Sequence, residues 1–205
     1  KTMTKTELAN IALGHIGSAK IQSIDENSPA AEHCRRMWES VRDGLLRQRH
    51  WNFALARAVL SKLDDAPAFD WDSAYQLPND YLLAISWNGR EAGTGESSFD
   101  IEDGKLLCDA DSNGTTETAN LRYVKRVESV SAWDASFCEA FTYKLAAAIA
   151  PSLSTSGNLA ADLMQKAEAL MVRAFGPDNL ESRPRVVLAQ TGSAYLAARQ
   201  GARNW

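Results

Sequence analysis

The sequence predicts an α+β fold that is predominantly helical: a four-helix bundle with an inserted β-rich domain and an extended C-terminal arm. Apolar residues recur at helical spacing near both ends of the chain. In the middle, Gly, Pro, Asp and Asn become frequent and short β-like runs replace the helical period. We therefore predict a helical bundle from 1–52 and 128–182, a β-rich insert from 53–127 and an arm without periodicity from 183–205.

The first two predicted helices begin at recognisable capping residues. Thr4 and Glu7 form the pattern of a capping box, in which each side chain accepts a hydrogen bond from the other residue's backbone amide. Ser28 and Pro29 are typical of an N-cap followed by a first-turn proline. The apolar stripe of the second helix is Cys34, Met37, Trp38, Val41 and Leu45.

The second predicted helix also carries a regular series of arginines. Arg35, Arg42 and Arg49 recur every seven residues, so they form a second, slowly drifting stripe. Asp43 and Arg47 are spaced to pair on the helix surface, where such a pair stabilises by only ~0.3 kcal/mol.

The region from 53–127 contains the β-like runs. Its first stretch, FALARAVLSKL, is ambiguous, because it is alanine-rich yet also alternates apolar and polar residues. Asp103-Gly104, between FDI and KLLC, is the strongest hairpin signal of the chain. This part of the sequence therefore predicts strands that protrude from the bundle.

Two further helices are predicted after the insert. The third begins at Ser131 with Asp134 in its first turn, and Pro151 ends it. Asn158 caps the fourth, which ends at Gly176-Pro177. Packing these two against the first two gives the predicted bundle.

The charge of the chain is divided unevenly. Residues 1–63 have ten basic and six acidic residues, a net charge of +4, whereas 64–119 have two and thirteen, a net charge of −11. Residues 120–182 have a net charge of −1, and 183–205 contain four arginines and no acid. This pattern argues against nucleic acid as a ligand of the middle segment. Either the acidic segment is one face of an electrostatically two-faced protein, or it is simply a solvated surface.

The composition indicates a globular protein of a reducing compartment. The 205 residues are 45% hydrophobic and 23% charged, which is enough for a core and too apolar for disorder. No apolar run approaches the ~20 residues of a membrane helix, and the first residues lack the order of a signal peptide. Three scattered cysteines, Cys34, Cys108 and Cys138, argue against a disulfide framework.

The sequence offers no convincing catalytic or metal site. Residues 109–114, DADSNG, match half of a calcium loop, but Asn120 stands where the bidentate glutamate belongs, so we favour a solvated turn. His33 and Cys34 are adjacent on a helix and cannot ligate one ion together. Phosphate-loop, nucleophile-elbow and zincin motifs are absent. We therefore expect neither an enzyme nor a bound cofactor.

Several stretches of the sequence resemble one family. These are ANIALGHIG at 9–17, the loop sequence Ser-Ile-Asp-Glu at 23–26, RRMWESVRDGLLRQRHWNFALARAVL at 35–60, and YQLPND at 75–80. Together they resemble the head-to-tail adaptor proteins of tailed bacteriophages, in particular the tail tubular protein A family of short-tailed phages. The residues that carry the resemblance are Asn10, Ala12, Leu13, Ile16, Gly17, Ser23, Ile24, Asp25, Glu26, Arg42, Asp43, Trp51, Asn52, Phe53, Ala54, Tyr75, Gln76, Leu77, Pro78, Asn79 and Asp80.

The resemblance implies a structural protein of the virion, located at the head-tail junction and assembled in the host cytoplasm. Such adaptors form a dodecameric ring between the portal protein and the tail nozzle protein. DNA passes through the lumen without sequence-specific binding, and no membrane or cofactor is involved. In this reading the β-rich part faces the tail and the C-terminal segment grips the portal.

The resemblance predicts roles for two groups of residues. Arg35, Arg42 and Arg49 are candidates for a subunit interface with acidic groups of a neighbour, or they are an ordinary exposed stripe. Trp51-Asn52-Phe53 mark the junction between bundle and insert. Either the aromatic cluster packs in the core and sets the angle between the two parts, which we favour, or it anchors assembly.

The arm from 183–205 is expected to bind the portal. Four arginines without an acid, and widely spaced apolar residues, describe a segment that needs a partner to supply apolar surface and counter-charge. The candidate contacts are Arg183, Arg185, Tyr195, Leu196, Arg199, Arg203 and Trp205. Tyr and Trp are frequent interface anchors. The alternative is a frayed terminus without a role.

Two other functions remain open from the sequence. One is a phage-associated cell-wall hydrolase that uses a carboxylate pair in the insert. The other is a generic intracellular interaction domain. Formation of a ring would separate the adaptor from both.

Overall fold

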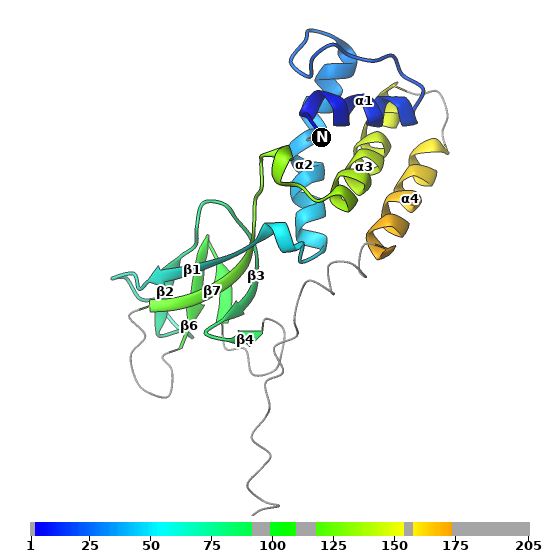
Figure 1. Ribbon diagram of the computed structural model, residues 1–205. Coiled ribbons are helices and arrows are strands. Elements are labelled where there is room, and N and C mark those ends of the chain that lie inside the picture. Colours follow the sequence, from blue (N-terminus) through cyan, green and yellow to red (C-terminus); the bar gives the residue numbers. More distant parts are fainter. Residues whose placement is uncertain (1–2, 92–98, 110–117, 154–157, 174–205) are drawn as a thin grey trace, which may run out of the picture.

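The computed structural model describes residues 3–91, 99–109, 118–153 and 158–173 (Figure 1). The C-terminal arm predicted from 183–205 lies outside the described residues. The described helices are α1 (Lys5–His15), α2 (Pro29–Gln48), α3 (Ala135–Leu153) and α4 (Leu159–Arg173), with short 3-10 helices η1 (Asn52–Ala54) and η2 (Val130–Ala132).

The first two helices begin where their caps predict. The Thr4 hydroxyl accepts from the Glu7 backbone amide at 3.2 Å, and the Glu7 carboxylate accepts from the Thr4 amide at 2.8 Å. The Ser28 hydroxyl accepts from the Ala31 amide at 3.3 Å, with Pro29 in the first turn. Both predicted helix starts are confirmed.

The third helix is the centre of the helical part. Its sequence is apolar on nearly every side, and its buried residues are Phe137, Cys138, Ala140, Phe141, Thr142, Leu145, Ala146, Ala147, Ile149 and Ala150. A helix that is apolar all round must be covered on all sides. The other helices α1, α2 and α4 each pack mainly against α3, which lies between α2 and α4 in Figure 1.

Our predicted ends of this helix are wrong. The helix begins at Ala135, not at Ser131, because the Asp134 carboxylate accepts from the Ser136 amide at 2.7 Å and so caps the helix. Pro151 does not end it, since α3 continues to Leu153, which packs against the helical core. A proline in the last turn removes one backbone hydrogen bond, and the partial burial of Leu153 against the helical core offsets that loss.

The strands form two antiparallel sheets. They are β1 (Leu55–Ser61), β2 (Ser73–Gln76), β3 (Tyr81–Trp87), β4 (Arg90–Glu91), β5 (Phe99–Glu102), β6 (Lys105–Cys108) and β7 (Thr118–Lys125). One sheet has the order β1-β7-β3-β4 and the other β2-β6-β5. The ambiguous stretch after residue 53 is thus a strand, paired with β7 from Leu55↔Val124 to Ser61↔Thr118.

Two tight turns close hairpins within these sheets. Asp103 and Gly104 have φ of 46° and 69° and connect β5 to β6, which confirms the predicted hairpin. Asn88 and Gly89, with φ of 45° and 84°, connect β3 to β4 in the same way. Positive φ at both central positions is the type I′ geometry that matches strand twist. Our sequence prediction does not include the second turn, although Asn-Gly is the typical sequence of a type I′ turn.

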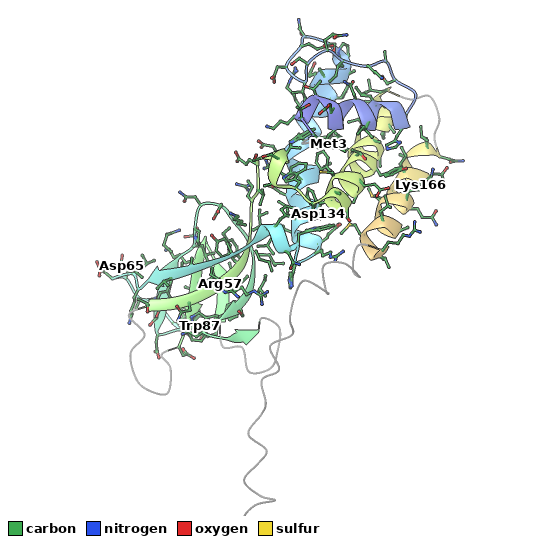
Figure 2. All side chains as sticks on the ribbon, viewed as in Figure 1. Met3, Arg57, Asp65, Trp87, Asp134 and Lys166 are labelled. Atoms are coloured by element: carbon green, nitrogen blue, oxygen red, sulfur yellow. The ribbon has the colours of Figure 1, made fainter. Side chains whose placement is uncertain are left out.

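The chain has two apolar cores that meet at β3 and β7. The helical core also takes in Leu82 and Val124 from these strands. The second core lies between the two sheets and includes Tyr75 and Trp87, both fully buried. Figure 2 labels Trp87 within the β part. The β part is therefore a second packed unit, continuous with the helices through the two strands that contribute to both cores.

These observations overturn the predicted fold class. We predicted a predominantly helical four-helix bundle with an insert, but the fold is a mixed one in which 47% of the described residues are helical and 23% are in strands. The prediction failed because it treated the strands as a protrusion. They form two sheets with a core of their own. The helices pack around α3 and do not form a ring of four equivalent neighbours.

Candidate functional site

The junction between the helices and the sheets is the most highly organised polar region of the described chain. The helix α2 ends there, η1 leads into β1, and β7 returns towards α3 (Figure 1). Residues that are far apart in the sequence, from 42 to 126, meet at this place. Its geometry decides how the helical and β parts are oriented.

Trp51 is the apolar centre of the junction. Its side chain is fully buried, and its ring meets the edge of Phe137 at 5.1 Å and 89°. Phe53 contacts the same phenylalanine at 5.2 Å. The Trp51 Nε1 donates to the Leu45 carbonyl at 3.2 Å, so the indole ties the end of α2 to the first residues of the β part. Asn52 lies between the two aromatic residues as the first residue of η1.

The Arg49 guanidinium lies over one face of the Trp51 ring and helps to shield it from water. The guanidinium lies 4.8 Å from the centroid of the Trp51 ring, and it donates to the Met171 carbonyl of α4 at 3.2 Å. Only 7% of the residue is exposed. A guanidinium over an indole face is attracted by the ring electrons, so Arg49 links the end of α2 to α4.

An ionic bridge joins α2 to Arg126, the residue that follows β7. The Asp43 carboxylate accepts from Arg42 Nε at 2.7 Å and from Arg126 Nε at 2.9 Å. The Arg42 side chain is only 4% exposed and that of Asp43 21%, so the pair is shielded from water. Removing one partner of a buried ion pair leaves a costly unpaired charge. This carboxylate therefore holds two arginines from different parts of the fold.

Hydrogen bonds to the start of β3 complete the junction. The Arg126 amide donates to the Asp80 carbonyl at 2.6 Å, and the Tyr123 hydroxyl donates to the Asp80 carboxylate at 3.0 Å. Burial, followed by the hydrogen bond and charge of Asp80, raises the pKa of Tyr123 to about 12. Arg47 donates to the Leu82 carbonyl at 2.6 Å. We call Arg42, Asp43, Asp80, Tyr123 and Arg126 the junction network.

The three arginines that we predicted as a subunit interface or an exposed stripe do not share one environment, and only Arg35 is exposed. Arg42 and Arg49 are buried, at 3% and 7% exposure. Arg35 donates to the carbonyls of Ile24 and Glu26 in the loop before α2. All three are thus used within the chain. The seven-residue spacing predicts a surface pattern, but Met171 of α4 and the Asp43 carboxylate meet Arg49 and Arg42, so these two arginines are buried.

The predicted pair between Asp43 and Arg47 is also wrong. Asp43 binds Arg42 and Arg126, whereas Arg47 reaches the backbone of Leu82 in β3. Residues in β3 and just after β7 lie beside this part of α2 and supply the partners of both side chains. Neither Arg126 nor Asp80 could be assigned to the site from spacing, because they lie 83 and 37 positions away from Asp43.

The loop before α2 is a second organised region. The Asn10 side chain donates to the Ile21 carbonyl at 2.9 Å and accepts from the Ile21 amide at 2.8 Å. The Glu26 carboxylate accepts from the amides of Gln22 and Ser23 at 2.7 and 3.2 Å. Hydrogen bonds from Ser28 and these two amides lower the pKa of Glu26. These side chains hold the loop in one conformation against α1.

The three cysteines and His15 are packed inside the fold and show no sign of activation. Cys34, Cys108 and Cys138 are buried, and burial raises the pKa of Cys34 and of Cys138 to about 11, so these two thiols stay protonated at neutral pH. His15 stacks on Tyr143 with ring centroids 4.1 Å apart, and burial lowers its pKa, with Lys166 adding to the effect. Its environment is that of a packing residue.

The described part of the chain also bears on metal ligands and membrane spans, whereas the predicted arm lies outside it. No group of three His, Cys, Asp or Glu residues could hold a metal ion there. The calcium-like stretch lies outside the described residues except for Asp109, and Asn120 lies in β7. None of the described helices is long and apolar enough to span a membrane. The portal contacts predicted in the arm fall in the range 174–205, which is not described.

A hollow at the far end of the β part was not anticipated from the sequence. It lies between residues 65–71 and the β5–β6 hairpin, and four carboxylates border it. The only sequence signals were the aromatic residues Phe69 and Trp71 within the acidic segment.

Comparison with known proteins adds no family assignment: a scan against protein-family models found no match, and neither did a search of curated proteins.

Proposed function

We propose that this chain is a structural head-to-tail adaptor of a tailed bacteriophage, which assembles into a ring between a portal and a tail nozzle. The proposal rests on the resemblance of the sequence to the tail tubular protein A family. One structural observation supports it above the others. Stretches that carry the resemblance, around Arg42-Asp43, Trp51-Phe53 and Asp80, converge on the junction.

This convergence gives the family-like residues a common physical role. Asp43 and Trp51 attach the end of α2 to the β part, and the Asp80 carbonyl receives the Arg126 amide beside them. A ring subunit must present two different faces at a constant angle, because a small change in angle alters the closure of the ring. A buried ion pair and a packed indole hold that angle better than exposed contacts.

The loop before α2 supports the same proposal. Asn10, Ile24 and Glu26 belong to the family-like residues. Asn10 of α1 bonds the loop at Ile21, Glu26 accepts from amides within the loop, and the Ile24 carbonyl accepts from Arg35 of α2. The loop therefore presents a defined surface on the helical part. A structural role accounts for such a loop without any catalytic group.

The experiment that tests the proposal is assembly of the purified full-length chain. The 22.4 kDa subunit is analysed by size-exclusion chromatography with light scattering and by class-averaged electron micrographs, alone and after mixing with portal rings from short-tailed phages. We expect ring-shaped averages, with or without the portal. A chain that stays monomeric at every concentration and does not bind the portal rings contradicts the proposal.

An assay of catalysis provides the complementary test. The same preparation should show no turnover of nucleotides, esters or cell-wall glycans. Activity that survives repurification and disappears when one Asp or Glu in 64–119 is changed would instead support the hydrolase.

A further inference from the structure

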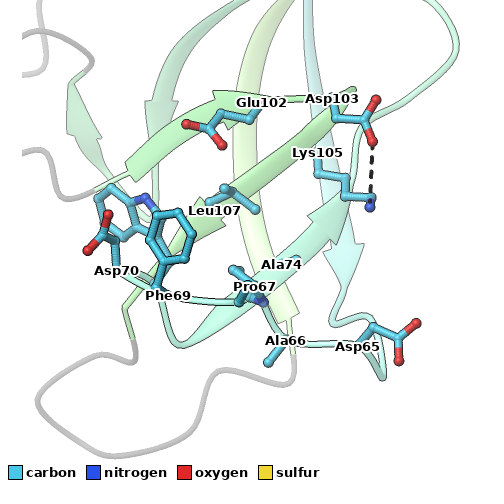
Figure 3. A pocket seen from close by; sticks show the side chains of 12 residues that line it. Asp65, Ala66, Pro67, Phe69, Asp70, Ala74, Glu102, Asp103, Lys105 and Leu107 are labelled. Carbon is cyan, nitrogen blue, oxygen red and sulfur yellow. Dashed lines mark ion pairs between the residues drawn. The ribbon is translucent and has the colours of Figure 1, made fainter.

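The hollow at the end of the β part has the form of a binding pocket. Its volume is about 320 Å³, at the small end of the range for ligand pockets. Phe69 and Leu107 form apolar walls, as Figure 3 shows, and Trp71 also lines it. Asp65, which borders the pocket, lies at the end of the β part remote from the helices (Figure 2). The pocket is thus separate from the junction network.

The rim of this pocket is acidic. Asp65, Asp70, Glu102 and Asp103 line it together with a single amine, Lys105. Lys105 lies 3.8 Å from Asp103, so the one cation is already close to a carboxylate. Asp65, Asp70 and Glu102 are exposed and make no ion pair with the other described residues. Three carboxylates are therefore available to a cationic ligand.

An exposed aromatic ring stands beside the carboxylates. Phe69 is 77% exposed, more than any other large hydrophobic residue among those described. A tight turn holds it there, in which the Trp71 amide donates to the Phe69 carbonyl at 2.9 Å and Asp70 has a φ of 67°. Exposed aromatic residues next to a hollow are typical of interaction sites. The ligand should accordingly bring apolar or planar groups as well as positive charge.

The sequence contains one segment with this chemistry. Residues 183–205 have four arginines, no acid, and the aromatic residues Tyr195 and Trp205. Guanidinium groups form paired hydrogen bonds with carboxylates and stack on aromatic faces. The pocket supplies both, since carboxylates and aromatic rings lie side by side on its rim.

A tether of known length joins α4 to this segment. Ten positions separate Arg173, the last described residue, from Arg183, and they can span up to roughly 33–36 Å. The full 32 positions to Trp205 can span roughly 105–115 Å. Attachment to the same chain makes this contact intramolecular, so its strength does not depend on the protein concentration.

We propose that the acidic pocket bordered by Phe69, Asp70 and Glu102 binds the arginine-rich segment 183–205 of the same chain. The inference does not rest on the adaptor function. If the segment also binds a portal, the pocket competes with the portal for it, and release from the pocket precedes docking.

Amide hydrogen exchange of the full-length chain tests this proposal. In the wild type, peptides from 183–205 should exchange more slowly than an isolated synthetic peptide of the same sequence. Phe69→Ala and, separately, the double variant Asp70→Asn/Glu102→Gln should each lower the protection factor about tenfold, because each weakens binding of the segment to the pocket. Salt at about 0.5 M should have a similar effect on the ionic part of the contact.

Two matched controls keep the test specific. Val59→Ala shortens an exposed apolar residue of β1 outside the pocket, and Glu168→Gln neutralises an exposed carboxylate of α4. Neither should change exchange in 183–205. All the substituted positions are exposed, and circular dichroism checks that each variant folds.

Three results would overturn the proposal. The segment could exchange as fast as the free peptide in the wild type. Its protection could persist in both pocket variants, which would place it elsewhere. Protection that falls on dilution of the protein would show that a second copy supplies the segment, whereas an intramolecular contact is independent of concentration.

Discussion

Replacement of Trp51 by alanine is the sharpest test of the junction. The side chain is fully buried, and a large aromatic residue buries roughly 150–250 Å², which at about 25 cal/mol per Å² corresponds to roughly 4–6 kcal/mol. Measured large-to-small changes at aromatic core positions cost about 3–5 kcal/mol, because the surroundings relax in part. We therefore expect Trp51→Ala to lower the free energy of unfolding by about 3–5 kcal/mol.

Specific contacts of the indole contribute to this value. The hydrogen bond from Trp51 to the Leu45 carbonyl contributes about 1 kcal/mol and the edge contact with Phe137 about 0.5–1.5 kcal/mol. Trp51→Phe retains a ring but loses the donor, so it should cost less than alanine. Val59→Ala is the control, because that side chain is 68% exposed and lies outside both the junction and the pocket, so its loss should change stability by about 0.5 kcal/mol or less.

Urea unfolding of the full-length chain, followed by far-UV circular dichroism, measures these differences. For a chain of this size each kcal/mol shifts the melting temperature by roughly 2–4 °C, so thermal unfolding should show a drop of roughly 6–20 °C for Trp51→Ala. An unchanged midpoint would refute the reasoning. If stability were unchanged while ring assembly failed, Trp51 would be an assembly anchor and the buried-core interpretation would be wrong.

Three further predictions concern buried polar groups. Asp43→Ala leaves the buried guanidinium of Arg42 without its partner and should destabilise by about 3–5 kcal/mol in urea; a loss below about 1 kcal/mol would contradict the shielded ion pair. The pKa of Tyr123 is about 12 in the folded chain against about 10 when unfolded, so the unfolded chain ionises first. Stability should therefore fall as the pH rises from about 10 to 12, and Tyr123→Phe should remove that component of the fall; an unaltered pH profile in the variant would count against it. Cys34 and Cys138, with pKa values of about 11, should resist a disulfide reagent such as DTNB at neutral pH until the chain unfolds, and rapid labelling of the native protein would exclude this environment.

The junction network connects the stability of the chain to its proposed function. Asp43 and Trp51 both attach α2 to the β part, yet through different physics, one by charge and the other by packing. Partial weakening, as in Trp51→Phe, should leave the fold intact while loosening the angle between the parts. If the adaptor proposal holds, such a variant should form fewer closed rings at a protein concentration where the wild type assembles.

Local features of this chain could be predicted because their partners lie within a few residues. The capping box of Thr4 and Glu7 and the N-cap of Ser28 each need only residues three positions away. The turn at Asp103-Gly104 depends on the backbone freedom of two adjacent residues. Such interactions involve no distant part of the chain, so sequence spacing is sufficient to identify them.

Features that depend on distant partners were decided only by the tertiary structure. Sequence spacing placed Arg42 and Arg49 on a surface stripe, but Arg126 and the Met171 carbonyl, with the elements around them, bury both. Local rules predict that Pro151 ends the helix, yet α3 continues to Leu153, which packs against the helical core. The balance between helices and sheets was misjudged for the same reason. Burial is a property of the assembled fold, and a local pattern cannot show which distant residues will cover it.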